Sequence, residues 1–124
     1  MVLLLIVAVG AAWALSRSGP MRLVQLSFAP GHWLDAPAAA AIERAVKASD
    51  VPRVNSSTRT RAQQQKLYDA YLAGTGNLAA PPGTSKHERG RAIDARGTPA
   101  WEAAMVANGW RRTVASEPWH WEFQ

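Results

Sequence analysis

The chain contains no cysteine, so disulfide bonds and thiolate metal ligands are excluded. Acidic residues are scarce: 9 Asp and Glu stand against 14 Lys and Arg, which gives a net charge of +5. This balance favours an anionic partner such as nucleic acid, a membrane surface or an acidic cell-wall polymer. Histidine is rare too, with 3 residues in the chain. Any metal site is therefore built from these few histidines together with carboxylates.

An apolar run of membrane-spanning length is also missing. The run from Val2 to Leu15 is shorter than the about 20 residues that a spanning helix needs. Its length suits the hydrophobic part of a secretory signal, with a small-x-small cleavage pattern at 12–14, although no Lys or Arg precedes it. The alternatives are a short membrane anchor that ends at Arg17 and a buried segment of the domain. We expect a secreted or cell-envelope protein with membrane contact through residues 2–15, or a cytoplasmic form if translation begins at Met21.

The length and composition allow one modest domain. Hydrophobic residues make up 48% of the chain and charged residues 19%, which is a globular composition. The segment SRSGP reads as a linker after the apolar run. We therefore predict a leader and linker at 1–20 and a single domain, expected to be a monomer, at 21–124.

Capping residues predict two helices in the first half of this domain. Asp35 is a plausible N-cap for a helix that runs to about Ala48. Thr60 and Gln63 form a capping box for a second helix, which Gly74 ends at the expected position. An apolar stripe at helical spacing follows this capping box, formed by Leu67, Tyr68, Tyr71 and Leu72.

The second half predicts one further helix and several short strands. Thr98 and Pro99 begin a helix that ends near Gly109. Strands are expected near 53–57, 110–113 and 119–123, the last two joined by a short connection. The predicted fold class is therefore α+β, with helices packed on a small, mostly antiparallel sheet.

Two short segments hold two of the histidines. The first reads SKHERGRAID and places Asp94 seven residues after His87. Gly90 permits a tight turn that folds His87 back toward a strand bearing Asp94. The second segment reads EPWHWEF and places Glu117 three residues before His120. A lone histidine on a surface loop, our interpretation of His32, has no special meaning, but both patterns together in this order are uncommon.

The residue types in these segments suit metal-dependent hydrolysis. Two imidazoles and one carboxylate are suitable ligands for a catalytic zinc ion, which keeps a fourth position open for water. A further carboxylate that does not bind the metal can act as general base. On the last strand, expected at 119–123, Trp119, Trp121 and Phe123 are predicted to point to one side, and His120 and Glu122 to the other.

These segments resemble the zinc D-alanyl-D-alanine carboxypeptidase family. That family includes vancomycin-resistance D,D-peptidases and the L-alanyl-D-glutamate endopeptidases of phage endolysins, and it shares a fold with the hedgehog signalling domain. The resemblance covers about Val54 to Phe123 and also includes TRTRAQQQKLY, in which an arginine precedes a helix with a glutamine and a Leu-Tyr pair. Thr58 departs from the family, where an aromatic residue is common, and Arg96 stands where an apolar residue is more usual. The short connection from 113 to 117 implies an open, minimal cleft.

The resemblance implies a role for six residues. It implies that Zn²⁺ is bound by His87, Asp94 and His120, and that Glu117 activates the water. It also implies that Arg59 stabilises the oxyanion or holds the substrate carbonyl, and that Ser85 hydrogen-bonds the substrate or orients His87.

Other interpretations remain open for several side chains. Arg59 is alternatively a solvated cation at a helix start, and Gln64 is expected to be structural. Glu122 either supports the metal ligands or is an exposed strand carboxylate. Four tryptophans are expected in the core, with one of them as an alternative pocket wall: Trp101, Trp110, Trp119 and Trp121.

The predicted function is a zinc metallopeptidase that cuts peptidoglycan stem peptides. The resemblance leaves open a D-Ala-D-Ala carboxypeptidase and an L-Ala–D-Glu endopeptidase, and the compact length favours the endopeptidase, which is endolysin-like. A form that begins at Met21 would be a phage-type lysin. The alternative is a catalytically inactive, zinc-stabilised cell-wall-binding module, against which the presence of Glu117 argues. A nucleic-acid partner is not expected, because the basic residues are scattered and no recognition motif is present.

Overall fold

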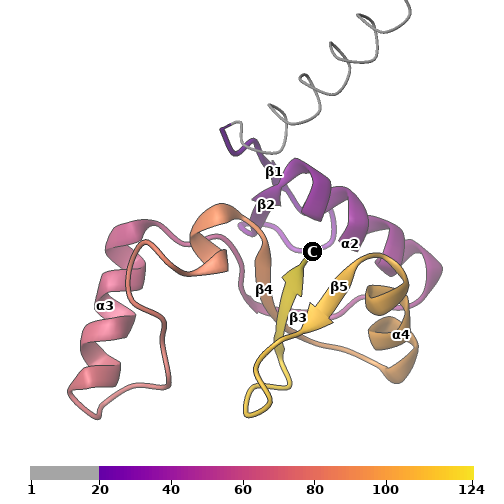
Figure 1. Cartoon of the computed structure of the whole chain (residues 1–124). Coiled ribbons are helices and arrows are strands. Elements are labelled where there is room, and N and C mark those ends of the chain that lie inside the picture. Colours follow the sequence, from indigo (N-terminus) through magenta and orange to yellow (C-terminus); the bar gives the residue numbers. More distant parts are fainter. Residues whose placement is uncertain (1–19) are drawn as a thin grey trace, which may run out of the picture.

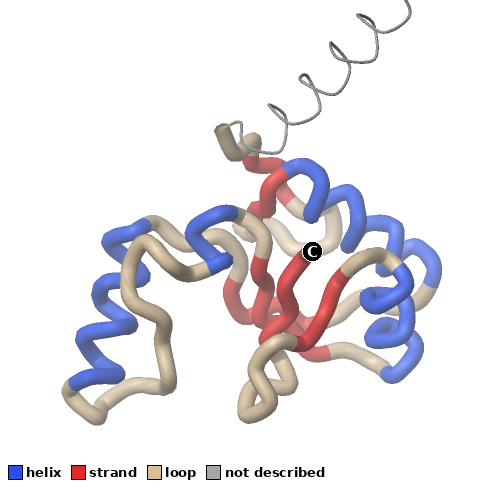
Figure 2. The backbone as a smooth tube through the Cα atoms, in the orientation of Figure 1, coloured by secondary structure: helices blue, strands red, loops and turns tan. Residues whose placement is uncertain are grey.

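The computed structural model describes residues 20–124, and the predicted leader at 2–15 lies outside this range. Over the described residues the chain forms three α-helices, one 3₁₀ helix and two antiparallel sheets (Figures 1 and 2). The predicted α+β class is confirmed. Within residues 20–124, no helix combines the length and the apolar character that membrane crossing requires.

Short strands and helices alternate along the chain. In order, they are β1 (Leu23–Gln25), β2 (Trp33–Asp35), α2 (Ala36–Ala48), β3 (Arg53–Ser56), α3 (Arg61–Leu72), the 3₁₀ helix η1 (Lys86–Arg89), β4 (Ala92–Arg96), α4 (Pro99–Ala107), β5 (Trp110–Arg112) and β6 (His120–Phe123). The predicted helices and strands agree with these bounds to within a few residues, whereas β1, β2 and η1 were not predicted.

The larger sheet has two faces of different character. Its strand order is β3-β4-β6-β5, and β1 and β2 form a separate hairpin. In the register between β4 and β6, Asp94 lies opposite His120, and Ile93 lies opposite Trp121. Opposite residues of an antiparallel pair share a face, so the first pair faces one side of the sheet and the second pair the other.

Helices α2 and α4 cover the apolar face of the sheet. Asp35 caps α2 by accepting a hydrogen bond from the Ala36 N–H at 3.0 Å. Thr98 caps α4 by accepting one from the Trp101 N–H at 3.1 Å. The predicted starts of both helices are thus confirmed. The core that they close includes Leu26, Leu34, Ala38, Ala41, Ile42, Ala45, Ile93, Ala95, Trp101, Met105, Trp110 and Trp121.

Helix α3 lies on the other side of the molecule from α2 and α4, beside the long loop that follows it (Figure 1). It begins at the predicted capping box and ends before Gly74, whose φ is 75°. Its single buried residue is Gln64. The apolar stripe is largely exposed instead of packed in the core, with Leu67 at 41%, Tyr71 at 38% and Leu72 at 65% of their full exposure.

Candidate metal centre

Three predicted ligands meet on the polar face of the sheet. Asp94 on β4 and His120 on β6 lie directly opposite each other, and His120 Nδ1 is 3.0 Å from Asp94 Oδ1. His87, from η1, places its Nε2 atom 3.3 Å from the same oxygen. One ligand atom from each residue lies within 4.8 Å of the other two. Residues 33 positions apart in the chain therefore converge on one point.

The capping of the short helix η1 positions His87 beside Asp94 and His120. Ser85 caps η1, and its Oγ accepts a hydrogen bond from the His87 N–H at 3.2 Å. Gly90 then turns the chain toward β4 with a φ of 68°, a conformation that favours glycine. A Cβ atom at this position would also lie 2.6 Å from the Asp35 nitrogen. The predicted tight turn is confirmed, and Ser85 orients the backbone of His87.

A backbone carbonyl fixes the ring of His87. The His87 Nδ1–H donates to the carbonyl oxygen of Ser57 at 2.7 Å, and the Arg59 N–H donates to the His87 carbonyl at 3.0 Å. A carbonyl only accepts, so Nδ1 carries the hydrogen and the Nε2 lone pair faces Asp94. Sequence reasoning missed Ser57, because every residue carries a carbonyl and its presence at this point leaves no pattern.

Arg59 is fixed from three directions. Its Nε–H donates to Ser56 Oγ at 3.1 Å, one Nη1–H donates to Gln64 Oε1 at 3.2 Å, and one Nη2–H donates to Asp94 Oδ2 at 2.9 Å. Burial lowers the pKa of Arg59, and the attraction of Asp94 and Glu117 offsets only part of that effect. Arg59 is therefore part of the site instead of a solvated cation at the start of α3.

The electrostatics favour an ionised Asp94 and raise the pKa of His120. Burial by itself would raise the pKa of Asp94, but its interactions with His120, His87 and Arg59 outweigh it and hold this pKa well below its usual value. Burial would lower the pKa of His120, yet the hydrogen bonds to Asp94 and Glu122 raise it overall. A carboxylate that stays charged near neutral pH is available as a metal ligand.

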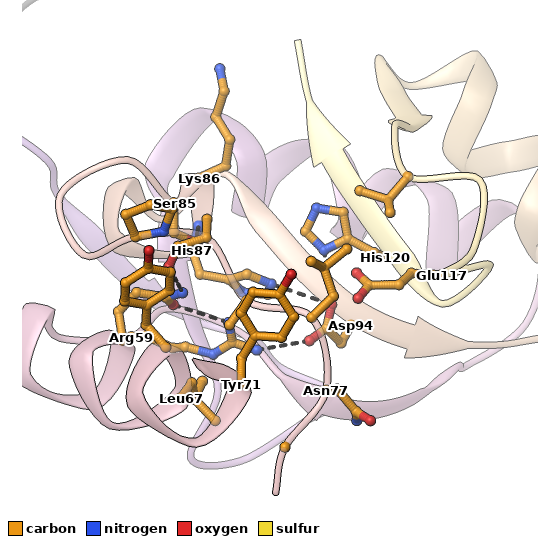
Figure 3. Close-up of a pocket in the computed structure, with 18 of the residues that line it drawn as sticks. Arg59, Leu67, Tyr71, Asn77, Ser85, Lys86, His87, Asp94, Glu117 and His120 are labelled. Carbon is orange, nitrogen blue, oxygen red and sulfur yellow. Dashed lines mark hydrogen bonds and ion pairs between the residues drawn. The ribbon is translucent and has the colours of Figure 1, made fainter. Parts of the chain in front are cut away.

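These residues line a cleft of about 990 Å³ between the polar face of the sheet and α3 with its following loop. The exposed side of α3 contributes Leu67, Tyr68 and Tyr71 to its wall. Glu117 lines the same cleft, and Figure 3 shows its carboxylate beside His120, on the side of Asp94. Among residues 20–124 the Glu117 side chain has no hydrogen bond and no ion pair, whereas the other residues of the centre are all paired.

The structure brings all six predicted site residues to one cleft: Arg59, Ser85, His87, Asp94, Glu117 and His120. Of the four tryptophans, Trp101, Trp110 and Trp121 are in the core as expected. Trp119 instead lines the cleft, and the Arg96 guanidinium lies over its ring, 4.9 Å from the centroid. Trp119 is thus the pocket wall that the sequence could not single out. The prediction that it shares the side of Trp121 and Phe123 was wrong, because β6 begins only at His120 and the strand alternation does not extend to residue 119.

The arrangement is chemically suited to a bound cation. Two imidazole nitrogens and one carboxylate oxygen point to a common position, and His87 Nε2 is held as a lone-pair donor. An unpaired carboxylate and a fixed guanidinium lie beside that position. The cluster of His87, Asp94 and His120 could therefore hold a metal ion with both a base and a cation at hand.

No protein-family profile and no curated protein matches the chain. Among solved structures, the chain is similar to a mutant of the vancomycin resistance D,D-pentapeptidase VanY in complex with Zn(II), with a TM-score of 0.63 and 23% identity over 84% of this chain and 79% of that one. It is also similar to VanYB in complex with D-alanine-D-alanine, with a TM-score of 0.62 and 22% identity. That match covers 85% of this chain and 78% of VanYB.

A third similar structure is the LD-carboxypeptidase LdcB, with a TM-score of 0.59 and 20% identity. The match covers 81% of this chain and 64% of LdcB. At these identities the likeness establishes the fold. The chain therefore has the fold of these peptidases, as its sequence motifs predicted.

Proposed function

We propose that this chain is a zinc-dependent peptidase that hydrolyses the stem peptides of peptidoglycan. One observation carries the proposal: the ligand atoms of His87, Asp94 and His120 lie within 4.8 Å of one another, in a cleft that also holds the unpaired carboxylate of Glu117. The similar structures support it, since one VanY structure is a complex with Zn(II) and another contains D-alanine-D-alanine.

The donor set fits zinc. In catalytic zinc sites three protein ligands leave one position open, and His87 Nε2, Asp94 Oδ1 and His120 Nδ1 would supply those three ligands here. When bound, zinc would polarise the substrate carbonyl as a Lewis acid and lower the pKa of a coordinated water to about 7.

Glu117 is the general base in this proposal. Its carboxylate is free of other partners in the described chain and faces the cleft beside His120 (Figure 3). It accepts a proton from the attacking water and then delivers that proton to the amine nitrogen that leaves. A carboxylate already bound to a cation, such as that of Asp94, would be a weaker base.

Arg59 stabilises the negative charge that develops on the carbonyl oxygen. A guanidinium has five N–H donors, and three of those of Arg59 bind Ser56, Gln64 and Asp94. The remaining donors are available to substrate, and the three fixed contacts hold them in place before the substrate arrives. Such preorganised donors act strongly in a cleft with little water.

The cleft favours cleavage within a peptide over removal of its last residue. Its volume of about 990 Å³ lies at the upper end of the roughly 300–1,000 Å³ of ordinary small-molecule sites. We take this volume as room for peptide on both sides of the bond to be cut. We therefore favour the L-Ala–D-Glu endopeptidase over the D-Ala-D-Ala carboxypeptidase.

Incubation of the purified full-length chain with peptidoglycan tests the proposal. We expect bound zinc by elemental analysis and, by mass spectrometry, fragments that end at L-Ala. Release of free D-Ala would instead assign a carboxypeptidase. Zinc binding without cleavage of any stem peptide would contradict the peptidase proposal and favour the inactive cell-wall-binding module.

Substitution of Glu117 tests the mechanism. The variant Glu117→Gln is expected to keep its zinc and to lose about 10²–10⁴-fold in kcat/KM, the usual contribution of a general base. Glu43→Gln is the matched control, because Glu43 lies on α2, where it contacts Ser27, and it should keep full activity. Loss of zinc from Glu117→Gln would move Glu117 into the ligand set.

A further inference from the structure

The second nitrogen of His120 is held by the carboxylate of Glu122, for which the sequence left two interpretations open. His120 Nδ1 faces Asp94 Oδ1, while Nε2 lies 2.9 Å from Glu122 Oε2. Both side chains of this second contact are largely buried, with 10% and 19% of their full exposure. The two ring nitrogens of His120 therefore face two different carboxylates.

Strand geometry produces this contact. Residues two apart on a strand share a face, so Glu122 follows His120 on the polar side of β6. In the register with β4, Glu122 lies opposite Ala92 and His120 lies opposite Asp94. The small Ala92 side chain leaves space next to Asp94, and the Glu122 carboxylate lies beside His120 instead of extending into solvent.

The contact with Glu122 suits the tautomer of His120 that metal binding requires. Asp94 and Glu122 are both acceptors, so without a metal either ring nitrogen can carry a hydrogen. A metal held between His87 and Asp94 would need the Nδ1 lone pair, and Glu122 is the acceptor that would then hold the hydrogen on Nε2. His87 has the opposite tautomer, because the Ser57 carbonyl holds its Nδ1–H. In a metal-bound form the two histidines would thus be held by different acceptors, the Ser57 carbonyl and the Glu122 carboxylate, with both lone pairs directed at the metal.

We propose that Glu122 is a positioning residue, which orients His120 and fixes its tautomer so that Nδ1 is the metal-binding nitrogen. This inference rests on the proposed zinc site and adds one further side chain to it. Carboxylates that hold a metal-binding histidine in this way also raise the basicity of the ring. Glu122 is not the general base, because its carboxylate is occupied by His120 whereas that of Glu117 is free.

Zinc affinity of two variants of the full-length chain tests the inference. Glu122→Met has a similar size but no acceptor, and we expect its zinc affinity to fall about 10–100-fold, as is usual when such a partner is lost. Glu122→Gln keeps an oxygen that can accept from Nε2–H, so its affinity should fall less. Glu102→Met on α4 is the control and should bind zinc as the wild type does.

Two readouts separate positioning from a general structural role. Titration of zinc against a chelator of known affinity gives the affinity itself, and thermal unfolding shows whether each variant is folded. In the wild type, long-range proton–nitrogen NMR of the zinc-bound protein should show the hydrogen of His120 on Nε2. That measurement needs no variant and holds even if Glu122→Met fails to fold.

The outcomes distinguish this inference from the proposed function. If folded Glu122→Met binds zinc as tightly as the wild type, or if His120 carries its hydrogen on Nδ1 in the zinc-bound form, the positioning role is wrong, whether or not the enzyme cuts peptidoglycan. If Glu122→Met loses zinc affinity while the wild type cuts no stem peptide, the positioning role holds and the peptidase proposal fails. A wild type that binds no zinc would overturn both.

Discussion

Helices α2 and α3 have 13 and 12 residues, and both begin at a side-chain cap, yet different forces hold them to the rest of the protein. α2 buries five residues against the sheet and α4: Ala38, Ala39, Ala41, Ile42 and Ala45. α3 buries Gln64 alone. Apolar burial holds the first helix, whereas α3 depends on hydrogen bonds at its base.

The difference follows from what lies beside each helix. α2 packs over the apolar face of the sheet, from which water is excluded. α3 borders the cleft, where Gln64 Oε1 accepts from Arg59 and Gln64 Nε2 donates to the carbonyl of Ala80 at 2.9 Å. One buried amide therefore links the helix, the long loop and the guanidinium of the site. Stability is concentrated on one face of the sheet, and the groups proposed for catalysis lie on the other.

The largest loss of folding stability is expected from a substitution on the apolar face of the sheet. Trp101→Ala removes a fully buried ring that packs edge-to-face against Trp121, and it should lower the free energy of unfolding by about 3–5 kcal/mol. Leu72→Ala on α3, where the leucine is 65% exposed, should change it by less than about 0.5 kcal/mol. Denaturant unfolding of both variants measures the contrast. Similar losses from the two substitutions would contradict the distinction between the two helices.

A smaller effect is expected from the polar link of α3. Gln64→Leu keeps the volume but leaves the Ala80 carbonyl and a donor of Arg59 without partners, which should cost about 1–3 kcal/mol in the free energy of unfolding. Activity should fall as well, because Arg59 is held less firmly. Gln65→Leu is the control, since Gln65 is exposed and bonds only to Asp69. Equal losses in the two variants would show that the link has no special role.

The smallest expected effect is the change of the free energy of unfolding with pH, which should arise from His120 on the polar face of the sheet. In the metal-free protein the pKa of His120 is raised above its ordinary value of 6.5. The folded state therefore holds this proton more tightly than the unfolded state. The resulting stabilisation is complete below about pH 6.5 and is lost as the pH rises through the raised folded value.

The pKa of Asp94 is shifted in the opposite direction. Because it is lowered from 3.8, its stabilisation is present above that pH and is lost only as the pH falls toward the folded value. Denaturant unfolding with a metal chelator, from pH 5 to 9, measures the His120 effect. His120→Gln should abolish most of the decline at the upper end, and an unchanged decline in this variant would assign it to other groups.

Much of the fold was predictable because its signals are local. Asp35, Thr60 and Thr98 satisfy N–H groups within the first turn of their own helices, so a few adjacent letters determine each helix start. Gly74 and Gly90 mark left-handed positions for the same reason. The alternation of His120 and Glu122 with Trp121 and Phe123 likewise follows from the period of a strand alone.

The fate of the α3 stripe was not predictable. Leu67, Tyr71 and Leu72 have the spacing of a buried helical face, but Leu67 and Tyr71 border the cleft and Leu72 is 65% exposed. Helical spacing shows which residues share a face and does not show what that face meets. For the same reason the sequence did not reveal which tryptophan, Trp119, would leave the core.

By itself the sequence determined the helix caps, the two-sided character of the last strand, and a set of side chains able to bind a metal. Only the tertiary structure decided that Asp94 lies opposite His120, that the Ser57 carbonyl holds His87, and that Glu122 holds His120. The physical reason is the separation along the sequence between the residues that interact. Capping and alternation are satisfied within a few residues, whereas sheet register and contacts to backbone carbonyls depend on how distant segments pack, and the letters of either segment alone do not encode that packing.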